Sequence, residues 1–236
     1  MLLPGPLKNL LRGSRGTEAE NGSAASARPS VSRSPMRKAN AADLVAVRSS
    51  RGLEEFFSYI RDQSGLTILD LGGASQENVS FITNLGHRLY SEDFVQILRE
   101  SFGAEDTTDQ SNPGRIDYFL RQALDYPEQQ FDGVLVWDVL EYLAPALLTA
   151  VVERLHKIVK PKSYMLAFFH SDDKLEAVPA YTFRIQEMNA LQVAQHGARR
   201  PTQLFNNRSL EKLFGKFEYV KFFLTRERLR EVIIKA

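Results

Sequence analysis

The 236-residue sequence contains no cysteine, which excludes disulfides, zinc–thiolate sites and cysteine nucleophiles. It also has almost no excess charge: 30 lysines and arginines stand against 29 acidic residues, and a net charge of +1 does not draw a whole chain to nucleic acid or membrane. No apolar run is long enough to span a bilayer. Because prolines and Lys8 interrupt the apolar start of the chain, we expect no secretory signal peptide and a cytoplasmic protein.

The charge that is present is unevenly distributed. Residues 1–52 hold nine basic and three acidic residues, a net charge of +6, and the remaining 21 basic and 26 acidic residues give 53–236 a net charge of −5. From Gly13 to Asn40 the chain is mostly Ser, Ala, Gly, Pro and Arg, a composition that buries too little apolar surface to offset the entropy of ordering. We therefore expect a disordered basic tail at 1–52, either simply solvated or acting as a tether, and a folded domain at 53–236.

The expected domain alternates helical and extended apolar patterns. Helices are predicted at 53–60, 77–85, 94–102, 145–159 and 210–217, the last with Ser209 as its N-cap. Strands are predicted at 67–71, 89–91, 116–120, 131–137 and 164–169, with an extra one at 181–185 and a loop at 103–114. The final runs, 219–224 and 229–234, are joined by a short turn and must pair antiparallel. This order predicts an α/β domain with a doubly wound, mostly parallel sheet and an antiparallel C-terminal hairpin.

The first predicted strand ends in a glycine turn, Asp70-Leu71-Gly72-Gly73-Ala74-Ser75. In open α/β sheets ligands bind outside the carboxyl ends of the strands, and glycines let the backbone approach them closely. The turn lacks the G-x-G-x-x-G pattern of dinucleotide sites and places a carboxylate, Asp70, where a phosphate would be repelled. It therefore suits a ligand that carries positive charge.

An acidic pair, Glu92-Asp93, follows the second strand about 20 residues further on. At this place a carboxylate can accept hydrogen bonds from both ribose hydroxyls of an adenosine. The pair is also compatible with the N-cap of the next helix. The glycine turn and the acidic pair, in this order, together indicate a nucleoside site.

At these residues the sequence resembles the class I S-adenosylmethionine-dependent methyltransferases. Residues 67–74 and 90–93 are similar to the first two motifs of that family, and 122–127 and 131–143 are similar to the third and fourth. The resemblance extends from about Leu53 to the C-terminus. It implies a Rossmann-like seven-stranded sheet in which the terminal hairpin supplies strands six and seven, S-adenosylmethionine as cofactor, and methyl transfer as the activity.

The resemblance also implies roles for individual residues. The cofactor would be bound by Asp70 at the methionine amino group, Gly72 and Gly73 at the close backbone approach, Glu92 or Asp93 at the ribose, Gln122 and the Ala123 amide at the adenine, and the backbone of Trp137 and Asp138 at the sulfonium. Three positions depart from the family. Ala74 stands where a further glycine is usual, Gln122 where an aspartate is usual, and Tyr142 where many relatives have histidine.

Methyl transfer requires an acceptor lone pair held in line with the methyl group, and it needs a base only if the acceptor must lose a proton. The candidate catalytic residues are His170, which ends the fifth predicted strand and titrates in the useful range, and Tyr142. His170 is equally compatible with a structural role in which it bonds to backbone. The candidate acceptor-binding residues are Glu141, Tyr142, Tyr181 and Arg184, and ordinary surface packing is the alternative for the last two.

Several acceptor classes are disfavoured. No N-P-P-[YFW] motif follows the fourth strand, the negative domain disfavours tight duplex binding, and no carboxylate or histidine cluster suggests a metal. A small molecule, a lipid precursor and a peptide remain as acceptors. Of these we predict in-line methyl transfer to an unidentified small molecule, with no metal and no membrane span, and we assign no oligomeric state. Two alternatives remain: a non-catalytic S-adenosylmethionine-binding protein, suggested by Ala74 and Gln122, and a nicotinamide-dependent oxidoreductase, disfavoured by the missing third glycine and the terminal hairpin.

Overall fold

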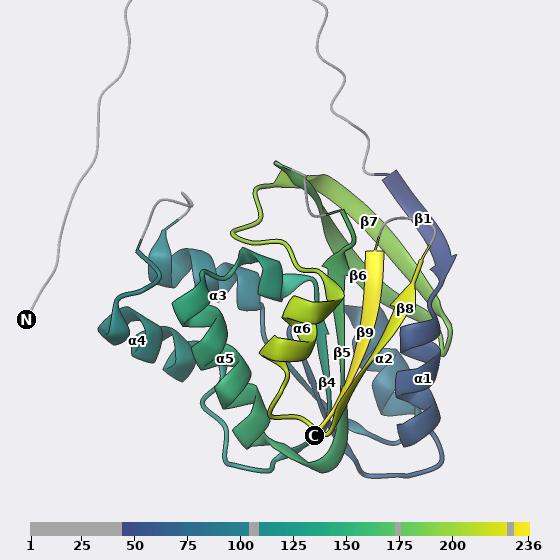
Figure 1. Cartoon of the computed structure of the whole chain (residues 1–236). Helices are drawn as coiled ribbons and strands as arrows, with labels where there is room; N and C mark the ends of the chain where they lie inside the picture. Colours follow the sequence, from purple (N-terminus) through teal and green to yellow (C-terminus); the bar gives the residue numbers. More distant parts are fainter. Residues whose placement is uncertain (1–43, 104–108, 173–175, 226–228) are drawn as a thin grey trace, which may run out of the picture. The chain divides into compact units, whose positions relative to one another are not determined.

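The computed structural model describes residues 44–103, 109–172, 176–225 and 229–236. Within them the strands form two sheets, a six-stranded one in the order β3-β2-β4-β5-β9-β8 and a three-stranded one in the order β1-β7-β6 (Figure 1). The larger sheet contains β2 (Thr67–Asp70), β3 (Arg88–Ser91), β4 (Phe131–Trp137), β5 (Val159–His170), β8 (Tyr219–Leu224) and β9 (Leu229–Lys235). The smaller contains β1 (Leu44–Ser49), β6 (Val178–Glu187) and β7 (Ala190–Arg199).

Helices connect and cover these strands. They are α1 (Arg51–Ile60), α2 (Gln76–Asn84), α3 (Phe94–Phe102), α4 (Pro113–Ala123), the 3-10 helix η1 (Val139–Tyr142), α5 (Pro145–Ile158) and α6 (Asn207–Leu213). The first three begin at side-chain caps, because Ser50, Ser75 and Asp93 each accept a hydrogen bond from the backbone N–H three residues further on. None of the helices in the described ranges is both long and apolar enough to cross a membrane.

The strand directions confirm the predicted sheet. Strand β2 pairs in parallel with β3 and β4, and β4 pairs in parallel with β5. Strand β9 lies antiparallel between β5 and β8, so the C-terminal hairpin forms the margin of the sheet as expected. The extra strand expected at 181–185 is part of β6, which pairs antiparallel with β7.

The strand predicted at 116–120 is wrong, and the larger sheet has six strands in the described residues rather than seven. These residues belong to α4 because Asn112 caps a helix there: its side-chain oxygen accepts a hydrogen bond from Arg115 N at 3.1 Å, and Pro113 occupies the first turn. The helix buries Phe119 and Ala123, which are four residues apart, on one face.

Two boundaries also differ from the predictions. Strand β1 and the first residues of α1 lie inside the segment expected to be a tail, so the folded chain begins before Leu53, while residues 1–43 of that expected tail lie outside the described residues. Helix α6 is capped by Asn206 rather than Ser209, because the Asn206 side chain accepts from Ser209 N at 2.9 Å.

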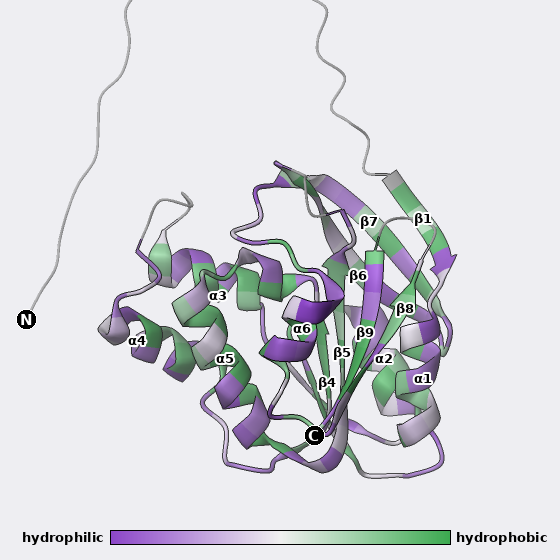
Figure 2. Cartoon of the chain, viewed as in Figure 1, coloured by the Kyte–Doolittle hydropathy of each residue, from purple (hydrophilic) through white to green (hydrophobic). Residues whose placement is uncertain are grey.

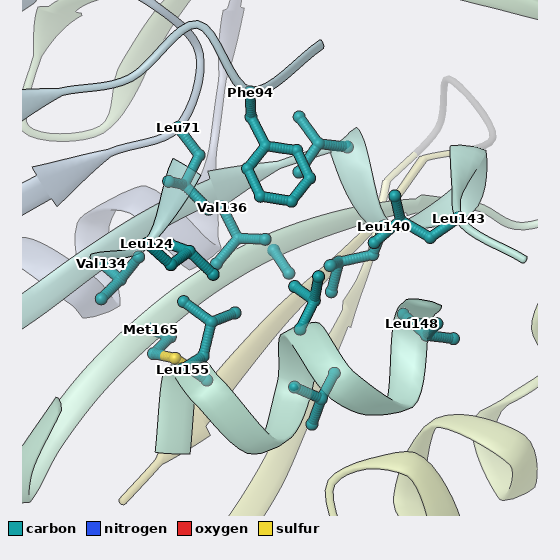
Figure 3. Close-up of a cluster of buried hydrophobic side chains, with 14 of the residues drawn as sticks. Leu71, Phe94, Leu124, Val134, Val136, Leu140, Leu143, Leu148, Leu155 and Met165 are labelled. Atoms are coloured by element: carbon teal, nitrogen blue, oxygen red, sulfur yellow. The ribbon is translucent and has the colours of Figure 1, made fainter. Parts of the chain in front are cut away.

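The larger sheet has an apolar layer on each face, and the two layers are covered by different elements. Figure 2 shows mostly hydrophobic residues along β4, whose side chains serve both layers. Side chains alternate along β4, so Val134 and Val136 pack with α3, α4, α5 and α6, as Figure 3 shows for part of this cluster. Leu135 and Trp137 point to the opposite face, where they pack with α1, α2 and apolar residues of β6 and β7. The smaller sheet therefore lies over the same face as Trp137.

Candidate active site

The first two sequence motifs meet at the carboxyl ends of β2 and β3. Glu92 N donates to the Asp70 carbonyl oxygen at 2.8 Å, and Gly73 N donates to the Glu92 carbonyl oxygen at 3.0 Å. Gly72 and Asp93 form an isolated antiparallel bridge. The glycine turn and the acidic pair are thus one continuous backbone structure, placed where ligands of open α/β sheets bind.

Asp70 lies beneath this turn and is completely buried. Its Oδ1 accepts hydrogen bonds from Gly72 N at 2.8 Å and Trp137 Nε1 at 2.6 Å, and its Oδ2 accepts one from Asn78 Nδ2 at 2.9 Å. Burial raises the pKa of Asp70 above its usual value, and the three hydrogen bonds oppose that rise. The Asp70 carboxylate therefore holds the backbone of the turn in place, and three donors of the protein itself already bond to its oxygens.

Trp137 ends β4 with a φ of 57°, a left-handed conformation that is rare for a large residue and is concentrated at functional sites. Its indole packs so closely on the turn that a Cβ at Gly72 would lie 2.7 Å from Trp137 Cδ1. On its other side the indole stacks on Phe183 of β6, with ring centroids 5.2 Å apart and planes inclined by 6°. The sequence analysis assigned a role to the backbone of Trp137 only. In the structure its side chain also packs against Gly72 and bonds to Asp70.

The outer side of the turn is open. Gly72 and Ala74 are exposed, and Gly73 has a φ of +84°, which glycine adopts without strain. A cofactor can therefore approach the Gly72–Gly73 backbone from solvent. The methyl group of Ala74, which replaces a usual glycine, also faces solvent and does not fill the turn.

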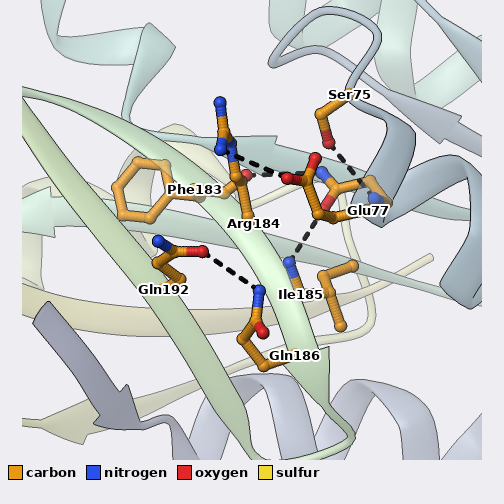
Figure 4. Close-up of polar contacts among 8 residues, drawn as sticks. Ser75, Glu77, Phe183, Arg184, Ile185, Gln186 and Gln192 are labelled. Carbon is orange, nitrogen blue, oxygen red and sulfur yellow. Dashed lines mark hydrogen bonds and ion pairs between the residues drawn. The ribbon is translucent and has the colours of Figure 1, made fainter. Parts of the chain in front are cut away.

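Asn78 of α2 is a site residue that the sequence analysis missed. Its side chain is buried and, besides its bond to Asp70, accepts from Ile185 N at 2.8 Å and donates to the Phe183 carbonyl oxygen at 3.4 Å. Figure 4 shows α2 and β6 side by side at this contact. The only sequence signal was a polar residue four positions before buried Ile82, on the inward face of the predicted helix.

The two acidic candidates at the end of β3 make different contacts. Asp93 is occupied as the N-cap of α3, because its Oδ1 accepts from Gln96 N at 2.9 Å. Glu92 is half-buried, and its Oε1 accepts a short hydrogen bond from the hydroxyl of Tyr126, a residue to which the sequence analysis gave no role. Burial and the Glu92 carboxylate raise the pKa of Tyr126, so its hydroxyl remains a donor.

The expected adenine-binding residues lie in the last turn of α4 instead of at the end of a strand. The Gln122 side chain is exposed, and Ala123 is buried against the core. The peptide that follows is held by Arg154 of α5, which donates to the carbonyl oxygens of Leu124 at 3.0 Å and Tyr126 at 2.6 Å.

A second polar cluster lies at the carboxyl ends of β4 and β5. The two oxygens of Glu141, which is completely buried, contact His170 Nδ1 at 2.6 Å and accept from His170 N at 2.8 Å. The Tyr142 hydroxyl donates to Asp138 Oδ2 at 3.3 Å. Burial and the nearby Glu141 raise the pKa of Asp138 to about 6. Within the described residues, no three His, Asp or Glu side chains gather as metal ligands.

The two remaining predicted acceptor-binding residues, Tyr181 and Arg184, both lie on β6 but contact different parts of the molecule. Tyr181 lies over the imidazole of His170, with ring centroids 6.1 Å apart, and so joins this cluster. Arg184 points to α2, where its Nη1 lies 3.2 Å from Glu77 Oε1 (Figure 4). Arg199 of β7, outside the predicted set, places its guanidinium 5.3 Å from the centre of the Tyr142 ring.

Comparison with known proteins gives one family match. A model described as "Methyltransferase domain" matches residues 42–221, which is most of the chain. No curated protein matches the sequence significantly.

Solved structures with a similar fold include three methyltransferases. The first is the 1,6-didemethyltoxoflavin-N1-methyltransferase of Burkholderia thailandensis, with 11% identity, 78% of this chain and 76% of that chain covered, and a TM-score of 0.44. A SAM-dependent methyltransferase of Archaeoglobus fulgidus has 16% identity, coverage of 78% and 92%, and a TM-score of 0.46. The glycopeptide N-methyltransferase MtfA has 13% identity, coverage of 85% and 99%, and a TM-score of 0.43. At such values the acceptors of these enzymes say nothing about the acceptor here.

Proposed function

The chain belongs to the methyltransferase domain family as a class I S-adenosylmethionine-dependent enzyme, and from this premise we propose that it methylates a small molecule bound beside Asp138, Tyr142 and His170. S-adenosylmethionine supplies an electrophilic methyl group carried on a sulfonium.

The proposal for the cofactor half of the site rests on the carboxyl ends of β2 and β3, which are hydrogen-bonded to each other. The exposed Gly72 and the left-handed Gly73 leave room for a ligand against the backbone, and the half-buried Glu92 stands beside them as an acceptor for ribose hydroxyls. Asp70 adds a negative charge beneath the turn, close to where a methionine ammonium would lie, while its own oxygens hold Gly72 and Trp137 in place. Gln122 and Ala123 remain the proposed neighbours of the adenine.

The acceptor half of the site follows from the position of the second polar cluster. Asp138 directly follows Trp137, and Trp137 contacts the glycine turn, so the cluster is contiguous with the proposed cofactor site. Glu141 holds His170, Tyr181 stacks on its imidazole, and Tyr142 bonds to Asp138. These residues orient an acceptor, and orientation alone provides much of the acceleration of an in-line displacement.

Calorimetric titration with S-adenosylmethionine, S-adenosylhomocysteine and NAD tests the cofactor half. We expect both sulfur nucleosides to bind and NAD not to bind. Replacing Glu92 with alanine should weaken nucleoside binding by about tenfold or more, because hydrogen bonds to a charged acceptor are lost. Glu100→Ala, which removes an exposed acid from the neighbouring helix α3, is the matched control and should bind as the natural protein does.

The acceptor class is tested by release of S-adenosylhomocysteine. Small molecules, peptides and duplex DNA are tested as acceptors in separate panels. We expect turnover in the small-molecule panel and none in the other two. Turnover that occurs only with peptide or DNA would refute the small-molecule proposal and leave the family assignment intact.

A further inference from the structure

The hydroxyl of Tyr126 connects two separate segments of the proposed nucleoside site. Glu92 follows β3, and Tyr126 lies between α4 and β4, where its hydroxyl donates a hydrogen bond to Glu92 Oε1. Burial and the neighbouring carboxylate raise the pKa of Tyr126, so the phenol keeps its proton and acts as the donor. Within the described residues nothing else bonds to the Glu92 side chain, so Oε2 remains available to a ligand.

The Tyr126 ring is ordered by aromatic packing. It makes an edge-to-face contact with buried Phe131 at the start of β4, with ring centroids 4.9 Å apart. A second edge-to-face contact, with centroids 5.8 Å apart, joins it to Tyr90 of β3. Such pairs favour a defined ring orientation, so the hydroxyl approaches Glu92 from a side chain that packing already fixes.

The backbone of Tyr126 is held as well. Arg154 of α5 donates to the Tyr126 carbonyl oxygen at 2.6 Å and to the Leu124 carbonyl oxygen at 3.0 Å. Tyr126 N donates to the same Leu124 oxygen at 2.9 Å. This short segment directly follows Ala123, the proposed neighbour of the adenine, so Tyr126 joins the adenine part of the site to the ribose part.

A fixed Glu92 is an advantage for binding. A glutamate side chain has many rotamers, and ordering such a side chain when a ligand binds costs conformational entropy. A hydrogen bond inside the protein removes most of that cost before the ligand arrives. The phenol is a neutral donor, so it orders the carboxylate without cancelling the charge that makes Glu92 a strong acceptor.

Resting on the proposed function, we propose that Tyr126 is a positioning residue whose hydroxyl holds Glu92 in the orientation that accepts the ribose hydroxyls of the cofactor. Tyr126 acts through Glu92, and Glu92 meets the ligand only at the ribose. The contribution of Tyr126 is therefore confined to nucleosides that carry free 2′ and 3′ hydroxyls. A residue that supported only the fold would affect every ligand of the site alike.

The test is calorimetric titration of the full chain and its variants with S-adenosylhomocysteine. Tyr126→Phe removes the hydroxyl and keeps the ring that packs on Phe131. It should weaken binding by about three- to tenfold, because Glu92 must then be ordered by the ligand. Tyr118→Phe is the matched control, since it removes a hydroxyl from a half-exposed ring of the neighbouring helix α4, and it should bind as the natural protein does.

Two further measurements separate positioning from a general effect on the fold. The 2′,3′-dideoxy analogue of S-adenosylhomocysteine has no ribose hydroxyls, so Tyr126→Phe should bind it as the natural protein does. In the second measurement Tyr126→Phe is combined with Glu92→Ala. The double variant should bind S-adenosylhomocysteine no more weakly than Glu92→Ala alone, because the hydroxyl then has no carboxylate to hold.

Three results would overturn the inference: unchanged or tighter binding of S-adenosylhomocysteine by Tyr126→Phe, an equal loss for the dideoxy analogue, or additive losses in the double variant. The proposed function fails in a different way. Unchanged binding of S-adenosylhomocysteine by Glu92→Ala would refute the assignment of Glu92 to the ribose, and the inference with it. A loss in Glu92→Ala without one in Tyr126→Phe would refute the inference alone.

Discussion

At the scale of single residues, the closest packing in the site is between Gly72 and Trp137. The indole Nε1 donates to Asp70 Oδ1 at 2.6 Å, and the ring is held on its far side by Phe183. Because the Trp137 side chain is buried and fixed on both sides, it cannot move away from a methyl group placed on Gly72.

Gly72→Ala is therefore expected to destabilise the protein by about 1–3 kcal/mol, since the new Cβ would lie 2.7 and 2.8 Å from atoms of the Trp137 indole. Gly114→Ala is the control: its Cβ would lie 3.4 Å from Asn112 Oδ1, an exposed side chain at the start of α4. Urea unfolding should show a loss of stability in the first variant and none in the second. Equal stabilities would contradict the packing described for Trp137.

Asp138 provides a pH-dependent prediction at the same scale. Burial raises its pKa from 3.8 to about 6, so the folded state binds the proton more tightly than the unfolded state. The carboxyl is neutral in both states below about pH 4, and above about pH 6 folding must bury its charge. The stability that this group contributes is thus present at low pH and is lost as the pH rises from about 4 to about 6.

Asp138→Asn removes that charge and should stabilise the protein by an amount on the order of 2–3 kcal/mol above about pH 6, with little effect near pH 4. Chemical unfolding of the variant and the natural protein at several pH values measures this difference. The exposed Asp125, changed to Asn, should give no pH-dependent gain. A gain for Asp138→Asn that is the same at every pH would contradict the burial of its charge.

At the scale of elements, α2 joins the cofactor turn to the smaller sheet. Buried Asn78 bonds at once to Asp70 beneath the turn and to the backbone of β6. A partly exposed ion pair, Glu77 with Arg184, lies beside it (Figure 4). The buried amide should dominate this connection, because exposed pairs contribute little.

Asn78→Ala leaves Ile185 N without its acceptor and removes a donor from Asp70, so we expect a loss of about 2–3 kcal/mol in the free energy of unfolding. Glu77→Ala on the same helix should change it by less than about 1 kcal/mol. Comparable losses in the two variants would mean that the surface pair, and not the buried amide, connects α2 to β6.

The elements also show what the sequence could predict. The end of β3 at Ser91, the helix that begins at Pro145 and the C-terminal hairpin were predicted, and the end of β2 was predicted to within one residue, because turn residues and apolar periodicity are local signals. Helix α4 was mistaken for a strand because a short apolar run does not distinguish the two periods, although Asn112-Pro113 was a helix start. Asn78 was missed because its partners lie up to 107 residues away, and no local pattern encodes such contacts.

At the scale of the whole molecule, the site lies at the larger sheet, between the elements that cover its two faces. On β4, Val136 points to the helices of one face, and Trp137 points to α1, α2 and the smaller sheet on the other. The glycine turn, the lone tryptophan and β6 therefore form one packed unit, and a ligand at the turn changes the surroundings of the indole. This arrangement makes Trp137 a reporter for the cofactor site, because the chain has one tryptophan.

The most direct test is a fluorescence titration of the full chain with S-adenosylhomocysteine, exciting Trp137. A cofactor site at the Gly72–Gly73 turn predicts a saturable change in emission with the same midpoint as the calorimetric titration, shifted to higher concentration in Glu92→Ala. Calorimetric binding without any change in Trp137 emission would place the nucleoside elsewhere on the molecule and contradict the assignment.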